Sequence, residues 1–209
     1  MRVKGIVKEL KAHAPMTFIG AFVGIILVFF FRNMSHQTAG NLFYILHPAH
    51  VLLSALATAG MYKRYQCSVD NKKCNLFFLL IIGYVGAVGI ATLSDSIIPF
   101  FGEKLLNMPH SHVHAGFIEK PILINCMALL GIIIAYLNPT TKFPHLGHVL
   151  LSTFASMFHI MMAKDTNMAL IVYLPMTIFL FMSVWLPCCI SDIVFPLLFV
   201  KSPDKGHDH

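Results

Sequence analysis

Two stretches of this sequence repeat one another. Residues 47–57 read HPAHVLLSALA, and residues 145–155 read HLGHVLLSTFA. Seven of the eleven aligned positions are identical, at a constant offset of 98 residues. Shared leucine and valine carry little weight in an apolar chain, but each copy also keeps two histidines three residues apart and a serine after them. The sequence therefore predicts two copies of one helix, each with a polar stripe along one face.

A second match follows each copy. Residues 94–99 read SDSIIP and residues 191–196 read SDIVFP, at an offset of 97 residues. Of the six aspartates in the chain, only Asp95 and Asp192 fall deep inside apolar blocks. Histidine, aspartate and proline are costly in such blocks, so matches between them indicate duplication rather than chance.

The composition places both copies in a membrane. The chain has 209 residues, of which 57% are hydrophobic and only 11% are charged, and its mean hydropathy is +0.74. Soluble domains carry about a quarter charged residues, which excludes a soluble enzyme, and a spanning helix needs about 20 apolar residues. The predicted fold is a single all-α membrane domain with six transmembrane helices, over about residues 15–31, 41–62, 75–101, 121–137, 143–163 and 167–200.

The internal repeat predicts an inverted topology. The repeats cover about residues 12–103 and about residues 118–200, with three spans each. Because three is odd, the second repeat enters the membrane from the opposite side, as in many secondary transporters. With the N-terminus inside, inner segments hold eleven lysines and arginines and outer segments hold four, so both termini are expected to be cytoplasmic, in an inner or plasma membrane. This topology explains the net charge of +6, so the expected partner is the lipid bilayer and not nucleic acid.

The polar stripes and the two aspartates predict a metal site inside the membrane. Such stripes should face the bundle interior, because they cannot face lipid cheaply. Two imidazoles and a carboxylate are a usual ligand set for Zn²⁺, Fe²⁺, Mn²⁺, Co²⁺ or Ni²⁺. Interhelical hydrogen bonding would explain one buried histidine, but duplicated pairs with duplicated aspartates favour a metal, with zinc or iron expected. The predicted ligands are His47, His50, Asp95, His145, His148 and Asp192, in one binuclear centre or in two separate sites.

Other residues are further candidate ligands. A cysteine pair precedes Asp192 and would make that site softer, although buried thiols are often inert. Alternating histidines in the predicted outer loop could collect a cation at the mouth, or could simply be solvated. One more histidine lies three turns beyond His148 on nearly the same helix face. These further candidates are Cys188, Cys189, His159, His110, His112, His114 and Glu119.

Transport of a divalent transition metal is the function that these features favour. Protons compete with metal ions for imidazole and carboxylate, so the transport is expected to be gradient-driven, with metal/proton competition at the His/Asp site. The chain has no phosphate-binding P-loop, so the energy must come from a gradient or from another subunit. Six spans make a thin bundle, and a homodimer is expected.

Two alternatives stay open. The chain could be a membrane metalloenzyme, in which a binuclear His/Asp centre acts on a lipid-soluble substrate. It could also be a b-type haem protein, because His36 and His50 are fourteen residues apart, as are His145 and His159. The fourteen-residue haem spacing does not follow the internal repeat, which argues against the haem alternative. Between the other two functions, transport is favoured over catalysis.

Overall fold

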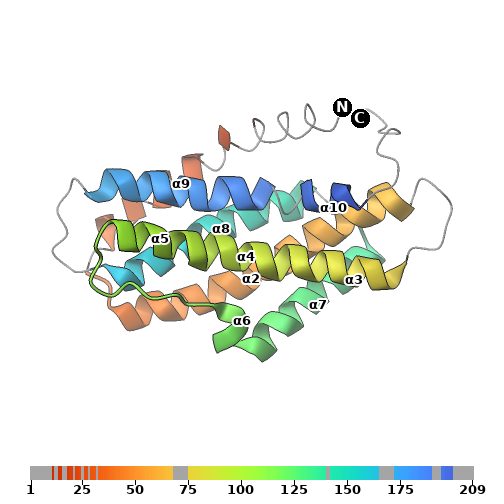
Figure 1. Cartoon of the computed structure of the whole chain (residues 1–209), viewed down its shortest axis with the longest axis horizontal. Helices are drawn as coiled ribbons and strands as arrows, with labels where there is room; N and C mark the ends of the chain where they lie inside the picture. The colour runs from red at the N-terminus through yellow and green to blue at the C-terminus, as the bar shows by residue number, and fades with distance from the viewer. Residues whose placement is uncertain are drawn as a thin grey trace.

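A computed structural model of the chain is a bundle of helices that lie roughly along one long axis (Figure 1). The structure describes residues 33–67, 75–139, 142–164, 172–189 and 194–199, with scattered positions between residues 11 and 31. These residues contain no strand, so the expected all-helical class is confirmed for them. Of the first expected span, over residues 15–31, only single positions are described.

Helix α2, His36–Tyr62, carries the first polar stripe. Ser35 caps its N-terminus, because its Oγ accepts a hydrogen bond from the backbone N–H of Thr38 at 3.1 Å. This cap lies upstream of the apolar block, so the helix begins five residues before the expected start at residue 41. Pro48 lies inside the helix without ending it, and the π-helical turn η1, Lys63–Cys67, extends the helix beyond its expected end.

The third expected span is one continuous helix, Leu76–Leu105. Its α-helical parts are α3 (Leu76–Tyr84), α4 (Ile90–Thr92) and α5 (Ile98–Leu105), and its π-helical turns are η2 (Val85–Gly89) and η3 (Leu93–Ile97). Pro99 follows η3 and has no backbone N–H to donate one turn back, which favours a locally altered hydrogen-bond pattern. Asp95 lies within η3, and π-helical turns are found frequently at functional sites.

The described residues of the second half of the chain form three longer α-helices and two short ones. They are α6 (Gly116–Glu119), α7 (Pro121–Leu137), α8 (Lys142–Ala163), α9 (Tyr173–Cys189) and α10 (Phe195–Leu198). Helix α7 has the bounds that the sequence predicted, and α8 begins one residue early. The block expected over residues 167–200 is described as two separate helices, with residues 190–193 between them outside the described part.

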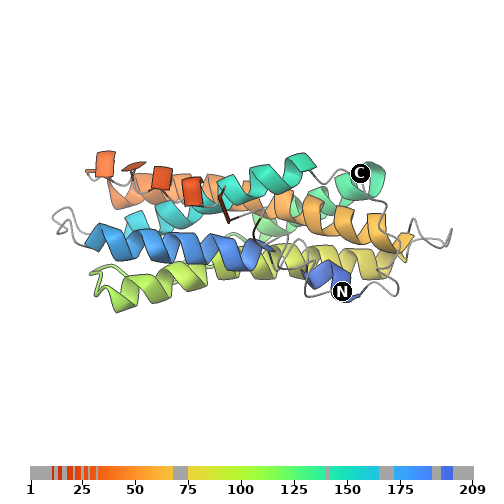
Figure 2. The ribbon, with the colours of Figure 1, turned by 90° about the horizontal axis from the view of Figure 1, so that it is seen from above.

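Helix α2 packs against α8 and α7, while α9 packs against α8 and α5. One apolar cluster lies between α2, α3 and α7, and a second lies between α2, α8 and α9. Figures 1 and 2 show α2 and α8 running in opposite directions along the bundle, as the colours show by residue number. The same figures show α9 running opposite to α3–α5. The helices with matching sequence motifs are therefore antiparallel to one another.

Two helices are long and apolar enough to cross a membrane, namely α2 and the continuous helix Leu76–Leu105. The other apolar helices are shorter, over Pro121–Leu137, Gly147–Ala163 and Leu174–Cys188. Large apolar side chains cover the outside of the bundle, and Ile122 is 81% exposed and Leu137 is 74% exposed. The structure thus supports membrane association through two of the six expected spans, by length and composition.

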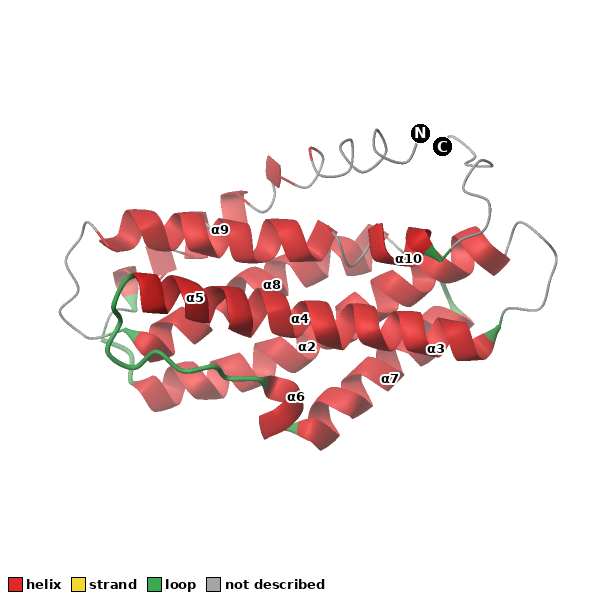
Figure 3. Cartoon of the chain, in the orientation of Figure 1, coloured by secondary structure: helices red, strands yellow, loops and turns green. Residues whose placement is uncertain are grey.

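The loop between α5 and α6 does not project away from the bundle. Figure 3 shows it in green, running back along the helices toward α6. The Ser96 hydroxyl donates to the carbonyl oxygen of His114 at 2.6 Å, and the His110 N–H donates to the carbonyl oxygen of Ala163 at 3.3 Å. On this folded-back segment the side chains of His110 and His112 remain exposed, while that of His114 is half-buried.

Candidate metal centre

The polar stripes of α2 and α8 face the bundle interior, as their spacing predicted. Every member whose side chain the structure describes is at most 1% exposed: His47, His50, Ser54 and Thr58 on α2, and His148, Ser152, Ser156 and His159 on α8. Because α2 and α8 pack together, the two stripes bring polar side chains from both repeats into one buried region.

Asp95 lies between the two histidines of α2. Its Oδ2 accepts hydrogen bonds from Nδ1 of His47 at 2.9 Å and from Nδ1 of His50 at 2.7 Å. All three side chains are buried, and they form one group that could hold a metal ion. The structure therefore brings together the three ligands that the sequence predicted for the first repeat.

The other oxygen of Asp95 is bound by serines from both repeats. Oδ1 accepts a hydrogen bond from the hydroxyl of Ser94 at 2.8 Å and from the hydroxyl of Ser152 at 2.8 Å. Ser156 on α8 lies 3.5 Å from the same oxygen and donates to the carbonyl oxygen of Ser94 at 3.1 Å. One carboxylate thus links α2, the η3 turn and α8.

The spacing of His47, His50 and Asp95 is that of hydrogen bonds. Zinc–nitrogen bonds of about 2.0–2.1 Å at tetrahedral angles would put the ligand atoms about 3.3 Å apart. A metal ion entering this group would move the donors apart by about 0.5 Å and would displace the hydrogen atoms from the two Nδ1 positions. Metal ions and protons therefore compete for the same atoms.

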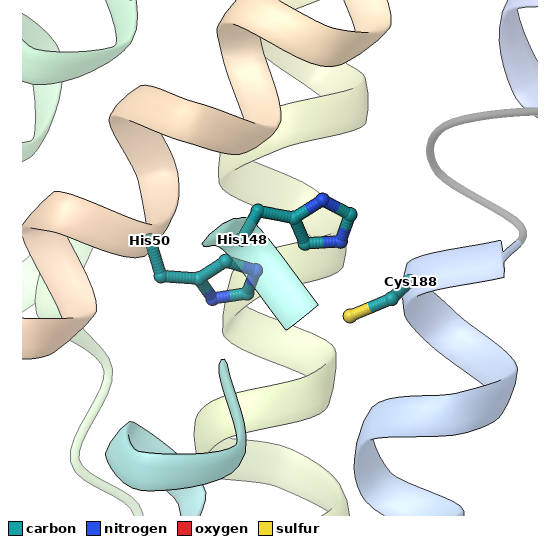
Figure 4. Close-up of side chains that lie close together, drawn as sticks. All are labelled: His50, His148 and Cys188. Atoms are coloured by element: carbon teal, nitrogen blue, oxygen red, sulfur yellow. The ribbon is translucent and has the colours of Figure 1, made fainter. Parts of the chain in front are cut away.

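A second group of potential ligands adjoins the first. His50, His148 and Cys188 are buried, and each offers one ligand atom within 4.8 Å of the others. The rings of His50 and His148 are stacked, with centroids 5.4 Å apart and planes 12° from parallel. Figure 4 shows both imidazoles turning a ring nitrogen toward the thiol of Cys188. A thiol beside two imidazoles favours a softer ion than an imidazole–carboxylate set does.

His50 belongs to both groups. Its Nδ1 is held by Asp95, which leaves the other ring nitrogen for the side of His148 and Cys188. A carboxylate that holds one nitrogen of a histidine fixes the ring and raises the basicity of the other nitrogen. Asp95 can therefore act as a ligand in the first group and as an orienting residue for the second.

His159 lies with Glu103 rather than with either ligand group. Its Nδ1 lies 2.7 Å from Oε1 of Glu103, and both side chains are buried. Near it, the Nδ1 of His114 lies 3.4 Å from Oε1 of Glu119. Burial, followed by the electrostatic effect of the neighbouring His159 and His112, lowers the pKa of His114 to about 4, while burial raises the pKa of Glu119.

The remaining loop histidines form pairs. The His112 ring packs against that of His114 with centroids 5.3 Å apart, and His110 packs edge-on against His36 at 4.6 Å. Among the described side chains, these loop candidates do not complete a group of three potential metal ligands.

The symmetric half of the predicted site lies outside the described residues. This holds for Asp192 and for the side chains of His145 and Cys189, although both of the latter residues belong to described helices. The pairing predicted for the second repeat therefore stays a prediction.

Two residues of this region were not predicted as site residues. Glu103 is 1% exposed and lies about two turns beyond Asp95 on the same helix. Gly116 packs so closely on His47 that a Cβ there would lie 2.5 Å from Cδ2 and 2.6 Å from Nε2 of that ring. Long-range contacts of this kind leave no periodic signal in the sequence.

Comparison with known proteins finds no matching family model, no matching curated protein and no matching solved structure. The functional argument therefore rests on the geometry of the buried polar groups.

Proposed function

We propose that the protein is an integral membrane transporter of a divalent transition-metal ion of the zinc or iron class. The observation that carries the proposal is the buried group of His47, His50 and Asp95, adjoined by His148 and Cys188. Nitrogen, oxygen and sulfur donors inside an apolar bundle can replace the hydration shell of such an ion. Ionisable residues at such positions mark ion pathways in membrane proteins.

The sharing of His50 favours transport over permanent storage of the ion. Because His50 belongs to both groups, an ion has two adjacent binding positions with one ligand in common. An ion that moves between them need not lose all of its ligands at once. Conduction requires sites that bind strongly enough for entry and weakly enough for release, and adjacent sites meet this requirement.

The proposed architecture is six transmembrane helices in two inverted repeats, with both termini cytoplasmic. Support comes from the antiparallel course of α2 and α8 and from the stacking of the equivalent residues His50 and His148. The bundle also has polar side chains inside and large apolar side chains outside, the polarity expected in lipid. A homodimer in an inner or plasma membrane is part of the same proposal.

Because protons and metal ions compete for the same atoms, a proton gradient across the membrane could supply the energy for transport. The atoms that would bind the metal are hydrogen-bonded imidazole nitrogens and a carboxylate oxygen. A pH difference across the membrane would therefore change the metal affinity on the two sides, and metal/proton exchange follows.

The test compares binding and flux in the full-length protein. Elemental analysis of the detergent-purified protein measures bound zinc and iron, and proteoliposomes loaded with a zinc-sensitive dye measure flux. We expect His50→Ala to weaken Zn²⁺ binding by about tenfold or more, because both groups lose a ligand. Asp95→Asn should abolish proton-coupled flux in a folded protein. His36→Ala is the matched control, since the His36 ring bonds the carbonyl oxygen of Met162 outside both groups.

Unchanged Zn²⁺ binding in His50→Ala would contradict the proposal and would make the cluster an interhelical hydrogen-bond network. Metal that is bound but never moved, together with a chemically altered lipid-soluble substrate, would instead identify a metalloenzyme. A Soret band in the purified protein would identify the haem alternative.

A further inference from the structure

A second buried histidine–carboxylate pair lies apart from the ligand groups. Glu103 on α5 and His159 on α8 are each 1% exposed, with Oε1 and Nδ1 2.7 Å apart. Glu103 lies eight residues after Asp95 on one continuous helix, which is about 12 Å along the helix axis. Neither residue belongs to a group of potential metal ligands.

Glu103 carries one carboxylate oxygen that has a partner and one that has none. The backbone N–H of His114 donates to Nε2 of His159 at 3.4 Å, so the ring hydrogen lies on Nδ1 and is donated to Oε1 of Glu103. The other oxygen, Oε2, is buried and has no hydrogen-bond partner among the described residues. A buried polar atom without a partner is costly, and a proton on this carboxyl group removes its charge.

The donor set of this pair suits a proton better than a metal ion. Transition metals take three or four protein ligands, and Glu103 and His159 supply two. A proton needs only the unpartnered carboxylate oxygen, and binding it makes a neutral carboxylic acid from the carboxylate.

An aromatic ring separates this pair from the metal ligands. Phe43 is stacked on His47 with centroids 5.1 Å apart and planes 10° from parallel. The same ring packs edge-on against His159 at 5.5 Å. A proton on Glu103 and an ion bound at His47 would therefore occupy different sites, with an apolar side chain in contact with both.

The pair is connected to the surface through the loop between α5 and α6. The His114 ring packs against His159 with centroids 5.5 Å apart, and its side chain is 27% exposed. Burial lowers the pKa of His114 to about 4, so this ring is neutral near pH 7.

Around Glu103, the titratable groups of the described residues come from α8 and from the neighbouring residue of α5, and Lys164, just beyond α8, is also buried. Helix α8 supplies His159, and α9 packs on the same segment through Phe179 against Gly102 and has no acidic, basic or histidine residue in its sequence. Lys104, the next residue, is exposed and lies over the Phe100 ring.

We propose that the Glu103–His159 pair is a proton-binding site distinct from the metal ligands, and that proton exchange at this pair, in addition to proton competition at the ligands, drives metal movement in the opposite direction. This inference rests on the proposed transport function. During one cycle, a proton adds to the Glu103 carboxylate from one side of the membrane and leaves toward the other, while the metal ion crosses in exchange.

The test uses full-length protein in liposomes that contain a zinc-sensitive dye and a pH-sensitive dye. In the wild-type protein, Zn²⁺ entry should be accompanied by a rise in internal pH, because protons leave as zinc enters. Glu103→Gln should bind Zn²⁺ as the wild-type protein does. The factor by which a pH gradient accelerates its Zn²⁺ flux should be about tenfold smaller than in the wild-type protein. Lys104→Gln is the matched control, because Lys104 adjoins Glu103 in the chain but its side chain is exposed, and this variant should keep the acceleration.

Retained acceleration in Glu103→Gln would overturn the inference, as would wild-type Zn²⁺ entry without any change of internal pH. If Glu103→Gln does not fold, Glu103→Asp keeps a carboxylate, so retained coupling in a folded Glu103→Asp protein that still binds Zn²⁺ would support the inference and loss of coupling there would contradict it. Absence of Zn²⁺ flux in every protein, with or without a gradient, would instead overturn the proposed function, so the two failures are distinguishable.

Discussion

Asp95 illustrates how much one residue can organise in this protein. It accepts hydrogen bonds from His47 and His50 on one oxygen and from Ser94 and Ser152 on the other. Removing one partner of a buried ionic network leaves the others unpaired, which costs more than the pair contributes when intact. Asp95 is therefore both a potential ligand and the residue that orients potential ligands.

Cys188 is expected to set the metal preference. Replacing it by serine, Cys188→Ser, exchanges a soft donor for a hard one beside His50 and His148, so the preference for Cd²⁺ over Mn²⁺ should fall by about tenfold. With Co²⁺ bound, the wild-type protein should show a thiolate-to-cobalt absorption band that the variant lacks. Cys126→Ser, at an exposed thiol, is the control. If Cys188→Ser and Cys126→Ser give the same Co²⁺ spectrum, Cys188 is excluded as a ligand.

At the scale of elements, two features give the polar residues their positions. The π-helical turn η3 carries Asp95 where α2 and α8 meet, and Pro99 follows it within the same helix. The loop after α5 folds back over the bundle and ends at α6, so that Gly116 lies against His47. Helix α6 and the loop before it thus cover the His47 ring, which the long helices alone would leave less enclosed.

Gly116→Ala is expected to disturb this cover. A Cβ at residue 116 would lie 2.5 Å from the His47 ring, so either the ring or α6 must move. We expect a several-fold loss of Zn²⁺ affinity and faster amide hydrogen exchange in the loop before α6. Gly89→Ala is the control, because nothing described lies within 4 Å of its added Cβ. Equal effects of the two substitutions would show that the contact with His47 is unimportant.

At the scale of the whole molecule, the bundle places polar groups inside and apolar side chains outside. Helices α2 and α8 carry equivalent motifs, run antiparallel and meet at His50 and His148. Under the proposed inverted repeat, two halves of opposite direction could form two related conformations, which is the geometry that alternating access requires.

The proposed topology predicts that two surface positions face opposite sides of the membrane. Arg64 follows α2 and Lys104 lies near the end of α5, and both are exposed in the structure. In a protein that lacks its natural loop cysteines, Lys104→Cys should react with a membrane-impermeant thiol reagent added outside intact cells. Arg64→Cys should react only after the membrane is opened. Reaction of both from outside would contradict six spans with cytoplasmic termini.

The sequence by itself determined the helical class, because long apolar blocks leave no alternative to helices in lipid, and it determined which faces are buried, because histidines and serines recur at helical spacing. It also grouped His47 and His50 with Asp95, since the repeat marked these rare polar residues twice. Tertiary structure alone decided that Cys188 joins His50 and His148, that Glu103 pairs with His159, and that the loop after α5 folds inward. These contacts join residues far apart in the chain, and they depend on helix packing and on the π-helical turn, neither of which has a local periodicity that could be read from the residues.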